Sequence, residues 1–390
     1  MTLDLETLIG WQHLLSDDER AIRASVRRFV EERCLPTIVD DFERGCFPRE
    51  RIRELAALGL LGANLQGYGC AGISSVAYGL ACHELEACDS GLRSFVSVQT
   101  SLAMHAIHTF GSEEQKQRWL PAMAQGSVIG CFGLTEPNAG SNPGAMTTRA
   151  VKDGSSWILH GEKMWITNAQ IADVAVVWAR TDESAASICG FVVPRDAAGF
   201  STPDIPHKLS LRASFTGALC LQDVRVDDKN RLPGVQGLRG PLSCLTAARF
   251  GVAFGVLGAG RFCLEQAIDY SRTRMLAPGV PMAKKQLVQE KLAGMASDVV
   301  LGSLLALHYG RLKDQGTLLP AQVSLLKRNN CRVALQCART ARALLGANGI
   351  VGDTHVLRHA LNLESTYTYE GTDEVHALVI GEALTGERAI

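Results

Sequence analysis

The pattern of hydrophobic and small residues changes twice along the sequence, and these changes limit the folds open to a chain of 390 residues. Amphipathic helical patterns fill the first third, Gly-rich and β-branched segments follow from about Gly130, and the helical period returns after Leu232-Pro233-Gly234. A chain this long exceeds one ordinary core, so separate subdomains are expected. We predict an α+β fold with an all-α domain at 1–129, an antiparallel β domain at 130–236 and a four-helix bundle at 237–390.

Local signals support this division. Ser16 with Glu19 three positions later is the pattern of a capping box, and Ser112-Glu113-Glu114 predicts the start of another helix. Amphipathic patterns at 288–299 and 325–345 predict long bundle helices. In the middle third, strands are expected at 133–137, 157–159, 174–179, 190–193 and 219–226.

Composition favours an enzyme that acts on a small molecule. The 39 basic and 40 acidic residues nearly cancel, and no basic stripe with interleaved aromatics suggests a nucleic-acid partner. No apolar run approaches about 20 residues, so no membrane span is expected. The 12 cysteines are scattered without Cys-x-x-Cys or His ligand spacing, so we expect reduced thiols, no metal site and a cytoplasmic location. Nothing near Met1 resembles a signal or transit peptide.

One carboxylate has an unusual setting. The segment Thr366–Leu378 reads T-Y-T-Y-E-G-T-D-E-V-H-A-L, with Glu370 directly before Gly371 at the end of a helical pattern. A glutamate in this position is commonly just a helix C-terminus. Because glycine permits a left-handed turn, the same pattern can also present Glu370 to a cavity as a general base.

Two further segments offer places for a ligand. Cys131–Asn142 reads C-F-G-L-T-E-P-N-A-G-S-N, a strand that runs into small residues whose amides and hydroxyls can approach a planar or anionic ligand. Lys163–Asn168 reads K-M-W-I-T-N, in which Trp165 either packs in the core or stacks on a cofactor. The chain has no dinucleotide-binding G-x-G-x-x-G after a strand, no P-loop and no H-E-x-x-H.

These segments together resemble the acyl-CoA dehydrogenase family over essentially the whole chain. Within that family the sequence is most similar to the glutaryl-CoA dehydrogenase branch. The segments that carry this similarity are R-S-F-V-S-V-Q-T-S-L at Arg93–Leu102, S-L-R-A-S at Ser210–Ser214, S-L-L-K-R-N-N-C at Ser324–Cys331 and E-V-H-A-L-V-I-G at Glu374–Gly381. The resemblance implies a homotetramer with one FAD per subunit and an electron-transfer flavoprotein as the acceptor.

The resemblance also implies which residues contact the cofactor. Thr372 and Arg274 are expected to bind FAD phosphates, Arg274 from a neighbouring subunit. Trp165 flanks the flavin, and Thr167 donates a hydrogen bond near its hydride-accepting nitrogen. The full set that lines the flavin is Leu134, Thr135, Ser141, Trp165 and Thr167.

Glu370 is the catalytic base by the same resemblance. A proton α to a thioester is only weakly acidic, so its removal needs a desolvated carboxylate of raised pKa and hydrogen-bond donors at the thioester oxygen. In the family one of those donors is the amide of Glu370. Some relatives place the base on the helix that corresponds to 244–256, but this stretch contains no Asp or Glu.

Arg93 is the residue expected to select the substrate. A guanidinium on an apolar helical segment needs an anion if it is buried. The alternatives are a solvated arginine or an internal pair with Glu86 or Asp89. The resemblance implies that Arg93 and Ser97 hold the distal carboxylate of a glutaryl thioester.

The implied reaction is the oxidative decarboxylation of glutaryl-CoA, or a close glutaryl thioester, to crotonyl-CoA and CO2. Glu86 and Tyr369 occur in the decarboxylating members of the branch, and Ser141 and Arg249 are implied as further substrate contacts. Departures from the family pattern at Asn142 and Leu276-Ala277-Pro278 keep other functions open. These are a non-decarboxylating dehydrogenase or flavin oxidase for another thioester, possibly carrier-bound, and a noncatalytic flavin or acyl-CoA binding protein.

Overall fold

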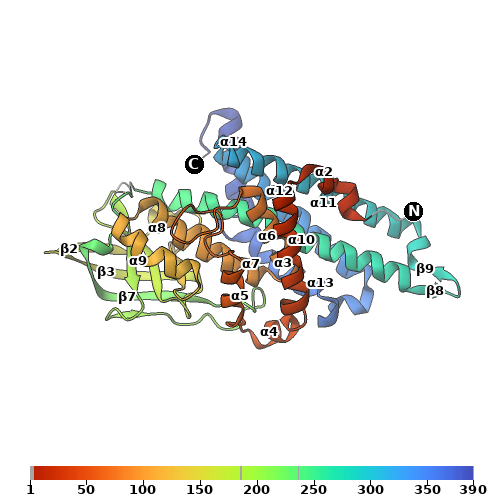
Figure 1. Cartoon of the computed structure of the whole chain (residues 1–390), viewed down its shortest axis with the longest axis horizontal. Helices are drawn as coiled ribbons and strands as arrows, with labels where there is room; N and C mark the ends of the chain where they lie inside the picture. The colour runs from red at the N-terminus through yellow and green to blue at the C-terminus, as the bar shows by residue number, and fades with distance from the viewer. Residues whose placement is uncertain (1–3, 185–186, 236, 390) are drawn as a thin grey trace.

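The computed structural model describes residues 4–184, 187–235 and 237–389, and Figure 1 shows a sheet at one end, short helices in the middle and long helices at the other end. The helical first third confirms the expected fold class. Its elements are α1 Leu5–Ile9, α2 Trp11–Leu14, α3 Asp17–Phe29, η1 Val30–Cys34, α4 Ile38–Arg44, α5 Arg51–Ala57, α6 Ser75–Cys88, α7 Ser90–Ser97, η2 Val98–Met104, α8 His105–Phe110 and α9 Glu113–Ala124.

The predicted helix starts are present. At α3 the Ser16 hydroxyl accepts the Glu19 amide and the Glu19 carboxylate accepts the Ser16 amide, which is a complete capping box. Ser112 begins α9 in the same way with Gln115. Each reciprocal pair satisfies two of the backbone amides that a helix leaves free at its start.

Helix α6 is buried along its whole length, because α3 covers one side and the long helix α10, Arg239–Thr273, covers another. The close contact between α6 and α10 depends on Gly258 of α10, where a Cβ atom would lie 1.8 Å from the carbonyl oxygen of His83 in α6. Any larger residue there would force the two helices apart. This packing fixes α6 and the adjoining α7 against the bundle.

The middle third forms a mixed sheet in the order β1-β4-β2-β3-β7-β6, with β5 paired to β4. The sheet was expected to be antiparallel throughout, but β1 and β4 pair in parallel, with Gly130 opposite Val174. The long connection between them contains the β2–β3 hairpin and returns the chain in its original direction. The strands are β1 Gly130–Gly133, β2 Arg149–Asp153, β3 Ser156–Thr167, β4 Val174–Arg180, β5 Ile188–Pro194, β6 Phe200–Ser201 and β7 Thr216–Asp227.

The strand expected at 133–137 is largely wrong, because β1 ends at Gly133 and the chain continues as a loop. The short 3-10 helix η3, Pro143–Ala145, interrupts the same connection. The other short 3-10 helices are η5 Asp228–Asn230, η6 Met282–Lys284, η7 Gly346–Ile350 and η8 Gly352–Thr354. The small residues therefore lie on irregular backbone directly beyond a buried strand.

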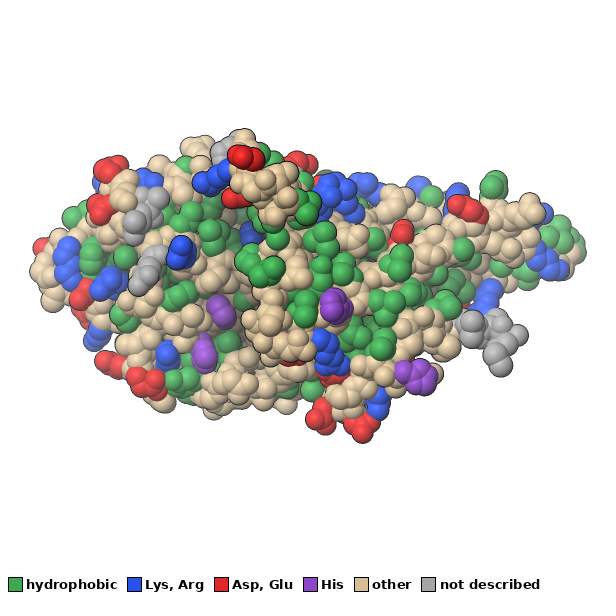
Figure 2. Space-filling view, turned by 90° about the horizontal axis from the view of Figure 1, so that it is seen from above, with side chains coloured by type: hydrophobic (Ala, Val, Ile, Leu, Met, Phe, Trp, Pro, Cys, Tyr) green, Lys and Arg blue, Asp and Glu red, His purple; other side chains and the backbone are tan. Residues whose placement is uncertain are grey.

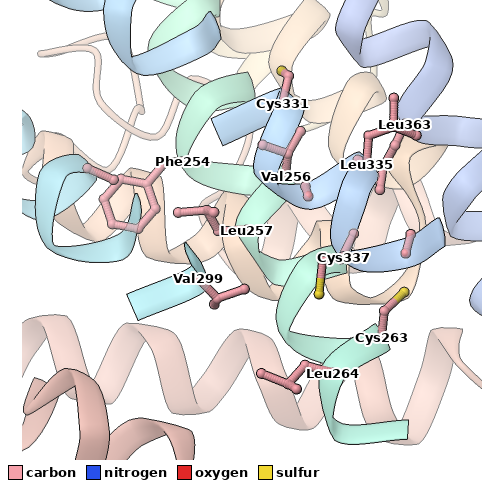
Figure 3. Packing of buried hydrophobic residues seen from close by; sticks show 14 of the residues in the cluster. Phe254, Val256, Leu257, Cys263, Leu264, Val299, Cys331, Leu335, Cys337 and Leu363 are labelled. Atoms are coloured by element: carbon pink, nitrogen blue, oxygen red, sulfur yellow. The ribbon is translucent and has the colours of Figure 1, made fainter. Parts of the chain in front are cut away.

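The last third is a helical bundle. Its elements are α10 Arg239–Thr273, β8 Met275–Ala277, β9 Val280–Pro281, α11 Gln286–Asp314, α12 Pro320–Leu344, α13 Val356–Thr368 and α14 Asp373–Thr385. Figure 3 shows side chains of α10, α11, α12 and α13, among them Leu257, Val299, Leu335 and Leu363, packed into one core. By length and hydropathy α10 and α11 could each cross a membrane, but the most apolar stretch of α10 is 67% buried in the protein. Core helices of a bundle meet the same criteria.

Candidate active site

Glu370 lies on a left-handed turn between two helices. Helix α13 ends at Thr368 and α14 begins at Asp373, and the intervening residues include Glu370 with φ +54° and Gly371 with φ +98°. A Cβ atom on Gly371 would lie 2.9 Å from the His376 ring, so glycine is needed both for the backbone angle and for space. Glu370 is thus placed on a strained turn after the helix.

Glu370 is half-buried as a whole residue, but its Oε2 atom is shielded from solvent and has no hydrogen-bond partner in the described part of the chain. Burial raises the pKa of Glu370 above its usual 4.5 because the charged form is poorly solvated. The nearby charges of Arg93, Arg249 and Lys327 oppose this rise. A carboxyl with a raised pKa in a desolvated position is suited to general base chemistry.

Arg93 is fully buried, which excludes the solvated alternative. Its Nε donates a hydrogen bond to Glu86 Oε2 and its Nη2 donates to the Tyr369 hydroxyl. The internal pair with Glu86 therefore exists, whereas Asp89 pairs with Arg358 instead. Burial raises the pKa of Tyr369, so its hydroxyl stays protonated.

The pair with Glu86 leaves hydrogen-bonding capacity unused in the same cluster. Arg93 Nη1, Glu86 Oε1 and Ser97 Oγ are all buried and have no partner among the described residues. Arg93 and Ser97 lie one helical turn apart on α7, so they share a face. Unpaired buried polar atoms are costly, and their concentration beside Glu370 indicates a site for a polar ligand.

The two small-residue segments are joined to each other. Lys163 Nζ on β3 donates to the carbonyl oxygen of Leu134 at 3.1 Å and to Glu136 Oε1 at 2.8 Å. The amide of Met164 donates to the carbonyl oxygen of Thr135 at 2.9 Å. These contacts hold the loop after β1 against the end of β3, so the two motifs form one surface.

Trp165 is 57% exposed although it is a large aromatic residue, and its backbone is left-handed with φ +62°. The register of β3 against β7 shifts between Lys163 and Ile166, so Trp165 lies within a bulge. Strained backbone and an uncovered indole are together unusual for a structural residue. This exposure excludes core packing for Trp165.

The other predicted contacts differ in their exposure and in their position in the fold. Leu134 is buried, Thr135 and Thr167 are half-buried, and Ser141 is exposed on the loop. Thr372 caps α14 and accepts the amide of Val375 at 3.3 Å. Arg274 ends α10 beside the β8–β9 hairpin, at the opposite end of the molecule from the sheet, so a role near that surface requires a second copy (Figure 1).

Arg249 lies at the turn that carries Glu370. Its Nε donates to the carbonyl oxygen of Glu370 at 2.7 Å. Sequence reasoning placed Arg249 near substrate but gave it no contact with this backbone. It gave no role to Lys327, which lies on the buried face of α12 with Val323, Leu326 and Ala334. A lysine on such a face is the signal that could have revealed it.

We expect Lys163→Met to destabilise the protein by about 3–5 kcal/mol, because the Glu136 carboxylate would stay buried without its cation. Thermal unfolding measures the effect. Lys152→Met is the matched control, since Lys152 pairs with Asp228 on the surface of the same sheet and should contribute at most about 1 kcal/mol. Equal losses in the two variants would contradict the assigned role of the buried pair.

Comparison with known proteins places these features in a family. Three models of the acyl-CoA dehydrogenase family match this chain. The N-terminal domain matches residues 16–127, the middle domain 131–224 and the C-terminal domain 235–385. The short-chain specific acyl-CoA dehydrogenase of human mitochondria is 34% identical over 94% of this chain and 90% of its own length. The chain belongs to the acyl-CoA dehydrogenase family.

Solved structures agree with this assignment. A glutaryl-CoA dehydrogenase from Mycobacterium smegmatis is 57% identical, covers 100% of both chains and has a TM-score of 0.97. A second structure of glutaryl-CoA dehydrogenase from that organism, in complex with FADH2, is 54% identical, with a TM-score of 0.97 and 100% of both chains covered. This acyl-CoA dehydrogenase is an enzyme, a flavoprotein oxidoreductase whose cofactor is FAD.

Proposed function

We propose that this acyl-CoA dehydrogenase oxidises and decarboxylates glutaryl-CoA, or a close glutaryl thioester, to crotonyl-CoA and CO2. The observation that carries the proposal is the buried Arg93 guanidinium, whose charge acts on the Glu370 carboxyl. Arg93 Nη1 and Glu370 Oε2 both have no hydrogen-bond partner among the described residues. A cation at this depth suits a substrate with a carboxylate at its far end. The similarity to glutaryl-CoA dehydrogenase structures supports the same substrate.

The proposed chemistry begins at Glu370, which removes a proton from the α-carbon while a hydride leaves the β-carbon. FAD, when bound, accepts that hydride. The product, glutaconyl-CoA, has its free carboxylate next to an unsaturated thioester that can accept an electron pair. Loss of CO2 leaves a dienolate, and protonated Glu370 returns the proton to the γ-carbon to give crotonyl-CoA.

The other residues of the cluster hold the substrate. Arg93 and Ser97 bind the distal carboxylate, and Glu86 and Tyr369 fix the guanidinium through the two hydrogen bonds described above. Ser141 lies on the loop after β1, and Arg249 lies beside Glu370. We propose that both residues also contact the thioester. The amide of Glu370 is proposed as a donor to the thioester oxygen.

The proposed flavin site is the surface made by the loop after β1 and the end of β3. Leu134, Thr135 and Ser141 line the ring, Trp165 flanks it, and Thr167 donates to it. Thr372 binds a phosphate of FAD. Arg274 binds FAD of a neighbouring subunit, which agrees with its distance from the sheet of its own chain (Figure 1).

We propose a homotetramer that passes electrons to an electron-transfer flavoprotein in the cytoplasm. Apolar side chains left uncovered on the bundle support assembly through its helices, and Figure 2 shows hydrophobic side chains spread over one face of the molecule. A shared bundle face would remove these side chains from water. The exposed leucines include Leu287 and Leu301 on α11, Leu319 at the start of α12 and Leu384 on α14.

The proposal predicts that glutaryl-CoA labelled in its free carboxyl group will release labelled CO2 as the flavin is reduced and reoxidised by an artificial acceptor. Crotonyl-CoA should appear in equal amount because each turnover removes one carboxylate. Trapped gas and chromatography of the thioesters provide the measurements. Accumulation of glutaconyl-CoA without CO2 would instead identify a non-decarboxylating dehydrogenase, and hydrogen peroxide formed in air without an acceptor would identify an oxidase.

A further inference from the structure

Lys327 is a buried cation in the site that the reaction as described does not use. It lies on α12, is 1% exposed, and takes part in no ion pair among the described residues. Its ammonium group instead donates to the carbonyl oxygens of Tyr369 at 2.9 Å and Gly371 at 2.7 Å, with a longer contact to that of Tyr367 at 3.4 Å. Burying a charge is costly unless its hydrogen bonds are satisfied, so this arrangement needs a reason.

The carbonyl groups of Tyr369 and Gly371 belong to the turn that carries the proposed base, and that of Tyr367 belongs to the last turn of α13. The carbonyl oxygen of Glu370, which lies between two of them, accepts a hydrogen bond from Arg249 at 2.7 Å. Consecutive carbonyl groups from 369 to 371 are therefore held by two cations from two different helices, α12 and α10. Such fixation explains how a left-handed Glu370, which is strained for a residue with a side chain, can persist on this turn.

We propose that Lys327 is a positioning residue that holds the turn between α13 and α14, so that Glu370 is presented to the α-carbon of the thioester. This inference rests on the role proposed above for Glu370. Lys327 touches the backbone of the turn and not the reacting atoms. Its contribution is geometric first, because a base displaced by about 1 Å from its proton can lose about 10²-fold in rate.

Lys327 also contributes to the charge that Glu370 experiences. Three positive groups act on the carboxylate, Arg93 from α7, Arg249 from α10 and Lys327 from α12, and each lowers its pKa. His376 of α14 packs on the same turn, and burial lowers its pKa to about 3, so it is neutral. Removal of the Lys327 charge should therefore raise the pKa of Glu370 further.

The test is Lys327→Met, which keeps the length of the side chain and removes its charge and donors. We expect kcat to fall about 10²-fold with glutaryl-CoA and with butyryl-CoA, while KM and the FAD content of the purified protein change little. A base must be deprotonated to act, so kcat/KM falls as the pH drops through the pKa of Glu370. In the variant this fall, the acidic limb of the pH profile of kcat/KM, should move to higher pH.

Two comparisons make the result specific. Lys313→Met removes a half-buried lysine of α11, which contacts Ser75 Oγ and the Phe250 ring and not the turn. This variant should leave kcat and the pH dependence of kcat/KM unchanged. Lys327→Arg keeps the charge but not the compact geometry, so the pH limb should stay in place while kcat falls. This second variant carries the test if Lys327→Met does not fold.

A crystal structure of Lys327→Met, or of Lys327→Arg, gives a readout that needs no substrate. We expect Glu370 to leave the left-handed region when its turn loses the lysine. A wild-type turn together with wild-type kcat and pH limb would overturn the positioning role. The proposed function fails separately, if the wild-type enzyme releases no CO2 from glutaryl-CoA.

Discussion

Glu370→Gln is expected to lower kcat with glutaryl-CoA by about 10²–10⁴-fold, the usual contribution of a positioned general base. Glutamine has nearly the same shape but cannot accept the α-proton. The thioester should still bind, because the Arg93 cluster and the turn are unchanged. Anaerobic titration with glutaryl-CoA measures the effect directly, since loss of flavin absorbance reports hydride transfer.

The matched control is Glu374→Gln, which changes an exposed glutamate on the first turn of α14 only a few residues away. It should bleach the flavin as the unaltered enzyme does. If Glu370→Gln also reduced its flavin at an undiminished rate, another group would have to be the base. The position of Glu370 on a strained turn would then need a different explanation.

Arg93→Met should raise KM for glutaryl-CoA about 10- to 100-fold and leave KM for butyryl-CoA nearly unchanged. The estimate follows from the loss of one charged hydrogen bond, about 1.5–3 kcal/mol, to a carboxylate that butyryl-CoA lacks. Steady-state kinetics with the two thioesters provide the comparison. Equal changes in KM for both would show that Arg93 does not contact the distal end of the substrate.

The same variant should unfold more easily, because Glu86 would remain buried without its cation at a cost of about 3–5 kcal/mol. Arg93→Met combined with Glu86→Gln separates stability from recognition. The double variant should regain much of the thermal stability, since no unpaired charge is left. Its KM for glutaryl-CoA should remain high.

The sequence was sufficient to predict the fold class and the order of its helical, sheet and helical parts. Hydrophobic periodicity and capping patterns located the helices, and short-range signals such as Ser16 with Glu19 were correct in detail. The parallel pairing of β1 with β4 was missed because strand patterns do not contain the direction of a partner that lies about 40 residues away. The same limit applies to most long-range pairings in a sheet.

Local sequence patterns did not predict the contacts within the site. An arginine on an apolar helix predicts a buried anion nearby, but only the fold shows that Glu86 and Tyr369 accept two of its hydrogen bonds. It also shows that Nη1 has no partner in the described part of the chain. The bulge that places Trp165 at φ +62° depends on the register of β3 against β7 and has no sequence signature of its own. The contacts of Lys327 with carbonyl groups of residues about 40 positions later are equally non-local.

The proposed contact of FAD with the exposed indole of Trp165 would link the amount of folded protein to the supply of the cofactor. Without FAD, a large aromatic surface on a strained strand faces water, which favours neither solubility nor a tight fold. A ligand that binds only the folded chain stabilises it, by about 1.4 kcal/mol for each tenfold excess of free FAD over its dissociation constant. Cells short of riboflavin would therefore lose this enzyme by unfolding and degradation as well as by inactivity.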